Sequence, residues 1–135
     1  MIVPEPIIYV PKLINGSFGK FIQIWINADG QRTPIFRLSE GSILESHGNI
    51  LEQTLNEFHI DFKRYPDDGS LKSNLPEINS SEYEMVGAGY SGVIKKLLFA
   101  FDDSSSYRLE PNREHFQALA QRVPGFRFEL RRPPV

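Results

Sequence analysis

The sequence predicts an α+β fold with a mainly antiparallel sheet of about six or seven strands and two helices. Several segments alternate apolar and polar residues between turn signals, while two others repeat apolar residues with helical spacing. The chain has 135 residues, the size of one ordinary domain, and shows no internal repeat or linker. We therefore expect residues 1–135 to form a single domain.

The first forty residues are expected to form a three-stranded meander. Residues 7–10 are enclosed by prolines, which cannot donate to a β-ladder, so they suit an edge strand. Residues 18–26 are apolar on both faces, as in a central strand that is covered on both sides. An Asp-Gly turn at 29–30 then leads into a returning strand at 33–38.

The period changes to helical between residues 43 and 58, where Gly48 interrupts the apolar stripe. Asn49 is followed three positions later by a glutamate, which indicates a helix N-cap. The regular part of the first helix is therefore expected at 50–58. Residues 60–65 alternate again and predict a strand.

Four strands and a helix are expected in the second half of the chain. Residues 83–86 read as a short strand, and residues 107–109 as another. Residues 93–101 fit either period, but two aspartates follow at once, and acids are unfavourable at a helix C-terminus, so a strand is favoured. The second helix is expected at 111–123, followed by a half-buried strand at 126–130 with one charged face.

The most motif-like stretch is the glycine-rich run at residues 87–92, which has the spacing G-x-G-x-x-G. It resembles the opening of flavin- and nicotinamide-binding Rossmann domains, in which such glycines approach the pyrophosphate and a later acid binds the ribose. The resemblance covers residues 85–110. It implies a dinucleotide site formed by Gly87, Gly89, Gly92 and Glu110.

The flanks of this run favour a different interpretation. Lys95 and Lys96 stand where the crossover helix of that family carries a small residue, and the chain after Gly92 is too short for the repeated βαβ units. We therefore expect a tight glycine-rich hairpin or bulge between the strands at 83–86 and 93–101, and no cofactor.

The titratable side chains leave one enzymatic alternative open. His59 and His115 could act as an acid–base pair in a small phosphodiesterase or nuclease. No two of the histidines His47, His59 and His115 have metal-ligand spacing, and the chain has no cysteine, so no metal site is expected. The simpler interpretation of each ring is a hydrogen-bonded surface or boundary residue.

Carboxylates occur in pairs in two Ser-rich loops, at Asp67–Asp68 and Asp102–Asp103. Such residues cap local amides in turns, and in a binding protein they would face a basic partner. Small cysteine-free α+β proteins are frequent among bacterial toxin-neutralising (immunity) proteins and other inhibitors of a single partner. This class-level analogy makes a non-catalytic protein-binding role our leading hypothesis, without fixing the partner or the oligomeric state.

The charge pattern weakens other functional classes. The net charge of −2 gives no strong overall field, and no membrane-spanning run or signal peptide is visible, so we expect a cytoplasmic protein. The C-terminal region is locally basic and could contact an anion, RNA or an acidic protein. No aromatic-plus-glycine RNA-binding signature accompanies it, so this alternative is not favoured. Its basic residues are Arg113, Arg122, Arg127, Arg131 and Arg132.

Overall fold

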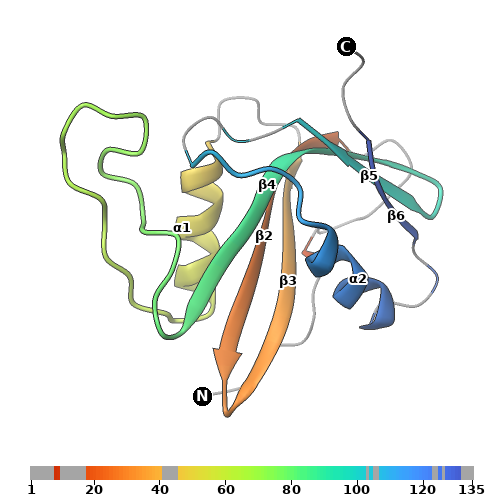
Figure 1. The fold of residues 1–135 in the computed structure, drawn as a ribbon, viewed down its shortest axis with the longest axis horizontal. Coiled ribbons are helices and arrows are strands. Elements are labelled where there is room, and N and C mark those ends of the chain that lie inside the picture. Colours follow the sequence, from red (N-terminus) through yellow and green to blue (C-terminus); the bar gives the residue numbers. More distant parts are fainter. Residues whose placement is uncertain are drawn as a thin grey trace.

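The computed structural model describes residues 8–9, 18–40, 46–102, 104, 107–122, 125 and 127–131. Within them, one mixed sheet has the strand order β1-β3-β2-β4-β5-β6, and one helix lies on each side of its central strands (Figure 1). The elements are β1 (Ile8–Tyr9), β2 (Phe18–Ala28), β3 (Gln31–Glu40), α1 (His47–Glu57), β4 (Tyr83–Ile94), β5 (Leu97–Phe101), α2 (Arg113–Arg122) and β6 (Arg127–Leu130).

The α+β class and the two helices are confirmed, whereas the details of the sheet differ from expectation. The pairs β1–β3 and β5–β6 are parallel, so the sheet is mixed. The first strands are not a meander, because β1 pairs with β3. Beside the two-residue β1 there are only five longer strands in the described chain, since residues 60–65 and 107–109 form isolated bridges instead of ladders.

The central strand is β2, which pairs with β3 on one side and β4 on the other. Its side chains alternate between two buried clusters, as its two apolar faces predicted. Ile22, Ile24 and Ile26 belong to the cluster beneath α1, and Phe21 belongs to the cluster beneath α2. We call these two sides of the sheet the α1 face and the α2 face. The turn to β3 is confirmed, with positive φ at both Asp29 and Gly30.

Helix α1 begins three residues earlier than predicted, because Ser46 and not Asn49 is its N-cap. The Ser46 side chain accepts a hydrogen bond from the Asn49 N–H at 3.1 Å. Gly48 is tolerated in the first turn because the Leu75 side chain fills the space that a Cβ would need.

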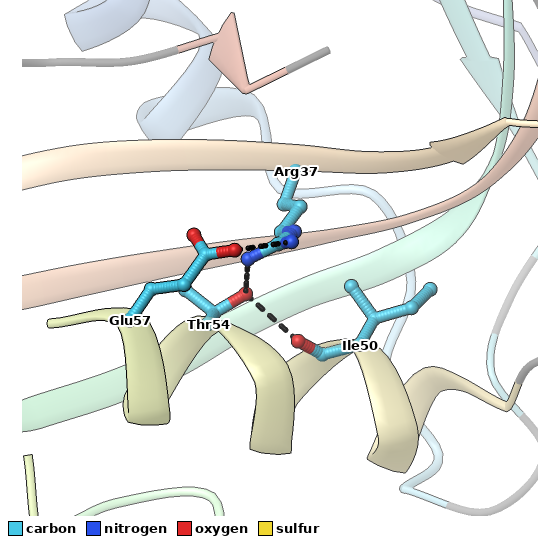
Figure 2. A network of polar contacts seen from close by, with 4 residues as sticks. All are labelled: Arg37, Ile50, Thr54 and Glu57. Atoms are coloured by element: carbon cyan, nitrogen blue, oxygen red, sulfur yellow. Dashed lines mark hydrogen bonds and ion pairs between the residues drawn. The ribbon is translucent and has the colours of Figure 1, made fainter. Parts of the chain in front are cut away.

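A polar network ties α1 to β3 on the α1 face (Figure 2). The Arg37 guanidinium donates to Glu57 Oε1 at 2.8 Å and to Thr54 Oγ1 at 3.4 Å. Thr54 in turn donates to the Ile50 carbonyl at 2.7 Å. Because the Arg37 side chain is largely buried, this ion pair is screened less by water than a fully exposed pair.

The glycine-rich run lies inside β4. The hairpin expected in the run is therefore absent, but the alternative expectation of a bulge is met at its start. The ladder with β2 shifts register between Gln23 and Ile24, whose partners are Gly87 and Met85, so Val86 is an extra residue. Such a bulge reverses which face each following residue occupies. As a result, Met85 and Ala88 both lie beneath α1.

The turn that was expected in the glycines occurs instead at Lys95 and Lys96, between β4 and β5. Residues 93–101 are therefore extended, as predicted, but they form the end of one strand and all of the next. Lys95 has a φ of 56°, a conformation that usually selects glycine, asparagine or aspartate. A lysine gives no turn signal, so the pattern concealed this hairpin.

Helix α2 lies in the concave side of the curled sheet and packs Phe116 and Leu119 into the cluster on the α2 face (Figure 1). Its N-terminus is capped by Asn112, whose Oδ1 accepts from the His115 N–H at 2.9 Å. The helix starts at Arg113, two residues after Pro111. Strand β6 follows as predicted, with Phe128 and Leu130 turned inward against the same cluster.

The substitution Gly87→Ala tests whether close packing excludes a side chain at this position of the glycine-rich run. A Cβ at Gly87 would lie 2.1 Å from Gln23 Oε1 and 3.0 Å from the Asn112 nitrogen. We expect the substitution to reduce the free energy of unfolding by about 1–3 kcal/mol, measured by urea denaturation. In a Gln23→Ala background the same substitution should cost much less. An equal cost in both backgrounds would contradict the steric explanation.

Ser91→Ala tests the reverse effect, the removal of an unsatisfied polar atom. Ser91 Oγ is the only buried side-chain oxygen or nitrogen without a hydrogen-bond partner in the described chain. We expect Ser91→Ala to raise the free energy of unfolding by about 1 kcal/mol. The matched control is Ser104→Ala, because the buried Ser104 hydroxyl accepts from the Tyr107 N–H and its loss should destabilise the fold. Equal effects of the two substitutions would refute this reasoning.

Candidate binding surface and the fate of the predicted site residues

The segment between α1 and β4 contains a long surface loop, as predicted, and its base is firmly anchored. Three tyrosine hydroxyls hold three consecutive backbone groups. Tyr107 donates to the Pro76 carbonyl at 2.9 Å, Tyr83 donates to the Glu77 carbonyl, and Tyr65 accepts from the Ile78 N–H at 3.3 Å. Burial raises the pKa of Tyr83 to about 12 and raises that of Tyr107 as well, so both hydroxyls stay protonated as donors.

Backbone hydrogen bonds continue this order toward the tip of the loop. The Tyr65 N–H donates to the Leu75 carbonyl at 2.9 Å, and the Tyr65 carbonyl accepts from Asn74 at 3.2 Å. Arg64 also forms an ion pair of 2.6 Å with Glu52 on α1. The two arms of the loop are therefore held to each other and to the helix.

The tip of the loop, residues 66–74, presents carboxylates beside an exposed apolar side chain. Asp67 Oδ1 accepts from the Ser73 hydroxyl at 2.9 Å, and Asp68 Oδ1 accepts from the Ser70 N–H at 3.0 Å. The hydrogen bonds from Ser70 hold the pKa of the Asp68 carboxyl below its usual value. Between these acids and Asn74, Leu71 is 72% exposed. We call residues 66–74 the acidic tip.

The second predicted acidic loop is described only in part. Asp102 is exposed directly after β5 and has a φ of 61°, which suits a turn aspartate. Asp103 lies outside the described residues. Within the described part of the chain, no group of three or more histidine or acidic side chains could hold a metal ion.

The structure does not bring His59 and His115 together. His59 is exposed just beyond the end of α1, whereas His115 is fully buried at the start of α2, on the other face of the sheet. Both nitrogens of the His115 ring are engaged: Nε2 donates to the Ile24 carbonyl at 3.0 Å, and Nδ1 lies 3.3 Å from Gln23 Nε2. Burial lowers the pKa of His115 to about 4. This geometry assigns the ring to the interior of the fold, and the two histidines share no pocket.

The residues of the possible dinucleotide site are close in space but are arranged for packing. Gly87, Gly89 and Gly92 are strand residues, and a hairpin follows them where a Rossmann site would need a helix. The space of a Cβ at Gly89 is filled by the Phe101 carbonyl, 2.6 Å away. Glu110 reaches this strand through its backbone, whose carbonyl accepts from the Ala88 N–H at 3.4 Å.

The C-terminal arginines divide between the two faces of the molecule. Arg113 and Arg122 lie exposed at opposite ends of α2. Arg127 and Arg131 are also exposed, but they lie on the side of β6 that faces away from α2, because Phe128 points into the α2 cluster. Arg132 lies outside the described residues. The predicted basic residues therefore do not form one cluster: two lie on α2 and two lie on or next to β6.

Sequence reasoning missed Leu71 and the anchoring tyrosines. An isolated leucine in a polar loop gives no periodic signal, although a large apolar residue between Gly69 and Lys72 was visible. The three tyrosines come from distant positions in the chain and meet only through the fold. The uneven distribution of charge along the chain was also visible in the sequence, but it was not used to predict a site. Residues 52–84 contain eight acidic and three basic residues.

No protein-family model matches the chain, and no curated protein is similar enough to be reported as a relative. No helix among the described residues has the length and apolar character needed to cross a membrane.

The buried His115 ring makes the fold sensitive to acid. The ring is neutral when folded and takes up a proton readily when unfolded, so its contribution to stability is intact above pH 6.5 and falls as the pH drops toward about 4. We expect the free energy of unfolding to fall by about 3 kcal/mol over this interval. The measurement is urea unfolding followed by the fluorescence of Trp25, whose ring contacts His115.

Two variants separate this effect from the titration of carboxylates. His115→Gln should flatten the dependence between pH 6.5 and 4, even if it is less stable at neutral pH. His59→Gln, which changes an exposed ring, should keep the wild-type profile. Identical pH slopes in the wild type and in His115→Gln would show that another group causes the acid sensitivity.

Proposed function

We propose that this chain is a small non-catalytic protein-binding domain, of the kind used by toxin-neutralising (immunity) proteins and other inhibitors of one partner, and that it presents the acidic tip to a basic partner. The observation that carries the proposal is the preorganised loop, in which three tyrosine hydroxyls fix the base and serines fix both carboxylates. The proposal includes a cytoplasmic location, because a small domain without cysteine is compatible with that compartment.

Preorganisation supports binding because a loop that is already ordered loses little conformational entropy when it meets its partner. The carboxylates of Asp67 and Asp68 would steer association with a basic surface. Leu71 would supply an apolar contact at the centre of the interface. Burying so large an exposed apolar side chain lowers the free energy of the complex. The acidic character of residues 52–84 extends the same field.

The second candidate, an enzyme that uses His59 and His115, has no geometric support. A general base must lie within hydrogen-bond reach of its proton, yet the His115 ring is fully buried and bonded on both sides. We therefore argue only for the binding function.

The test is purification of the tagged chain from its native host, followed by quantitative mass spectrometry of bound proteins. We expect one basic protein to bind, and Asp67→Asn/Asp68→Asn to weaken its capture by about tenfold or more. Asparagine keeps the Oδ1 acceptors of the loop while removing both charges. Leu71→Ser should weaken capture without changing the thermal midpoint.

The matched control is Glu110→Gln/Glu114→Gln, which removes two carboxylates outside the acidic tip. This variant should capture the partner as the wild type does. The proposal fails if no protein co-purifies stoichiometrically, or if the control pair reduces capture as much as the loop pair.

A further inference from the structure

A second surface lies on the α1 face of the sheet, where the sheet extends past α1 along β4, β5 and β6 (Figure 1). The side chains of β5 alternate, so Leu98 and Ala100 are buried beneath α2 while Leu97, Phe99 and Phe101 point to the other side and are only partly buried. A strand with one covered face ordinarily carries polar residues on its open face. Here the open face is apolar and aromatic.

Neighbouring strands extend this apolar surface. The register pairs Tyr90 with Phe101 and Ile94 with Leu97, and it places Phe18 of β2 in line with Gly92. Phe18 and Ile94 are each 50% exposed, and with Leu71 they are the exposed large hydrophobic residues of the described chain. We call the group of Phe18, Tyr90, Ile94, Leu97, Phe99 and Phe101 the aromatic face.

The rings of the aromatic face are grouped around Phe101. Its ring centroid lies 5.9 Å from that of Phe18, 6.1 Å from that of Tyr90 and 6.1 Å from that of Phe99. The Phe99 ring leans over β4 because Gly92 has no side chain: a Cβ there would meet the ring at 2.5 Å. Gly92, the last glycine of the G-x-G-x-x-G run, therefore leaves space for the Phe99 ring.

Basic side chains border these rings. The Arg131 guanidinium lies 4.2 Å from the centroid of the Phe99 ring, which makes a planar cationic platform. Arg127 lies on the same side of β6, and Lys20 of β2 is level with Tyr90. The one acid of β6, Glu129, is paired with Arg131 at 3.1 Å. Lys95 and Lys96 add two further positive charges at the tip of the hairpin.

We propose that the aromatic face binds a single-stranded nucleic acid. Proteins hold single strands by stacking bases on exposed aromatic rings and arginine planes while basic side chains contact the phosphates, and a sheet surface is a frequent platform for this. Phe18 and the Phe99–Arg131 pair supply stacking surfaces, and Arg127 and Lys20 supply phosphate contacts. The charge favours this ligand over a basic protein. The β4–β5 turn and the β6 segment carry four basic residues, Lys95, Lys96, Arg127 and Arg131, and one acid, Glu129, although the chain is acidic overall.

The proposal is independent of the acidic tip, which lies at the other end of the molecule (Figure 1). The test uses the full chain with fluorescein-labelled oligo-U and oligo-dT of about ten nucleotides, followed by fluorescence anisotropy. We expect saturable binding that weakens between about 50 and 200 mM salt, with a log–log slope of about −0.7 for each phosphate contacted. A duplex of the same length should bind more weakly.

Two variants locate the site. Phe18→Leu should weaken binding by about tenfold, because it removes an exposed stacking ring and leaves an apolar residue in the strand. Arg127→Gln should weaken binding and reduce the magnitude of the salt slope by about 0.7. Arg127 is exposed and outside the core, so this second variant keeps the proposal testable if Phe18→Leu affects folding. The matched control, Arg113→Gln/Arg122→Gln on α2, should bind as the wild type does.

The proposal is overturned if neither oligonucleotide binds saturably at the lower salt concentration, or if the control pair lowers affinity as much as Arg127→Gln. It is also overturned if sedimentation velocity shows that the chain alone self-associates and that Phe18→Leu abolishes this, because the aromatic face would then be a protein interface. Retained binding by both site variants would equally exclude this surface.

Discussion

The structure depends on one buried polar constraint, the side chain of Gln23 in the middle of the central strand. Its Oε1 accepts from the Asn112 N–H at 2.7 Å, and its Nε2 donates to the Asn112 carbonyl at 2.9 Å. Asn112 caps α2, and His115 in the first turn completes the network. A buried amide of this kind is costly unless every group is paired, so the position of α2 is fixed by the strand beneath it.

The glycine-rich run follows from this constraint. Gln23 fills the space beside Gly87, and the adjacent bulge at Val86 lets the apolar residues on both sides of it remain beneath α1. Further along β4, Gly89 permits the close approach of the backbone at the end of β5, and Gly92 permits the Phe99 ring to lean over the strand. The same three glycines that resemble a phosphate loop are thus required by three different neighbours, each of which occupies the place of a side chain.

Turn residues and apolar patterns predicted those parts of the fold that depend on residues close together in the sequence. Asp29–Gly30 produced its hairpin, the two apolar faces of β2 identified the central strand, and the stripe beginning at Ile50 identified a helix. The failures have long-range causes. A bulge breaks the alternation that reveals a strand, a lysine at positive φ conceals a turn, and the pairing of β1 with β3 is set by the packing of distant segments. Site prediction failed for the same reason: His115 is identified as an interior residue only once Gln23 and Ile24 surround it.

Several buried polar side chains of the described residues serve the structure, and both proposed binding sites lie on the surface. The tyrosines, His115 and Gln23 all direct their polar atoms at backbone groups or at one another. The acidic tip and the aromatic face differ in charge, in side-chain chemistry and in position (Figure 1). The acidic tip would repel a nucleic acid, and the basic residues that border the aromatic face would repel a basic protein. If both surfaces bind, they bind different molecules, and the rigid sheet between them holds those molecules at a fixed separation.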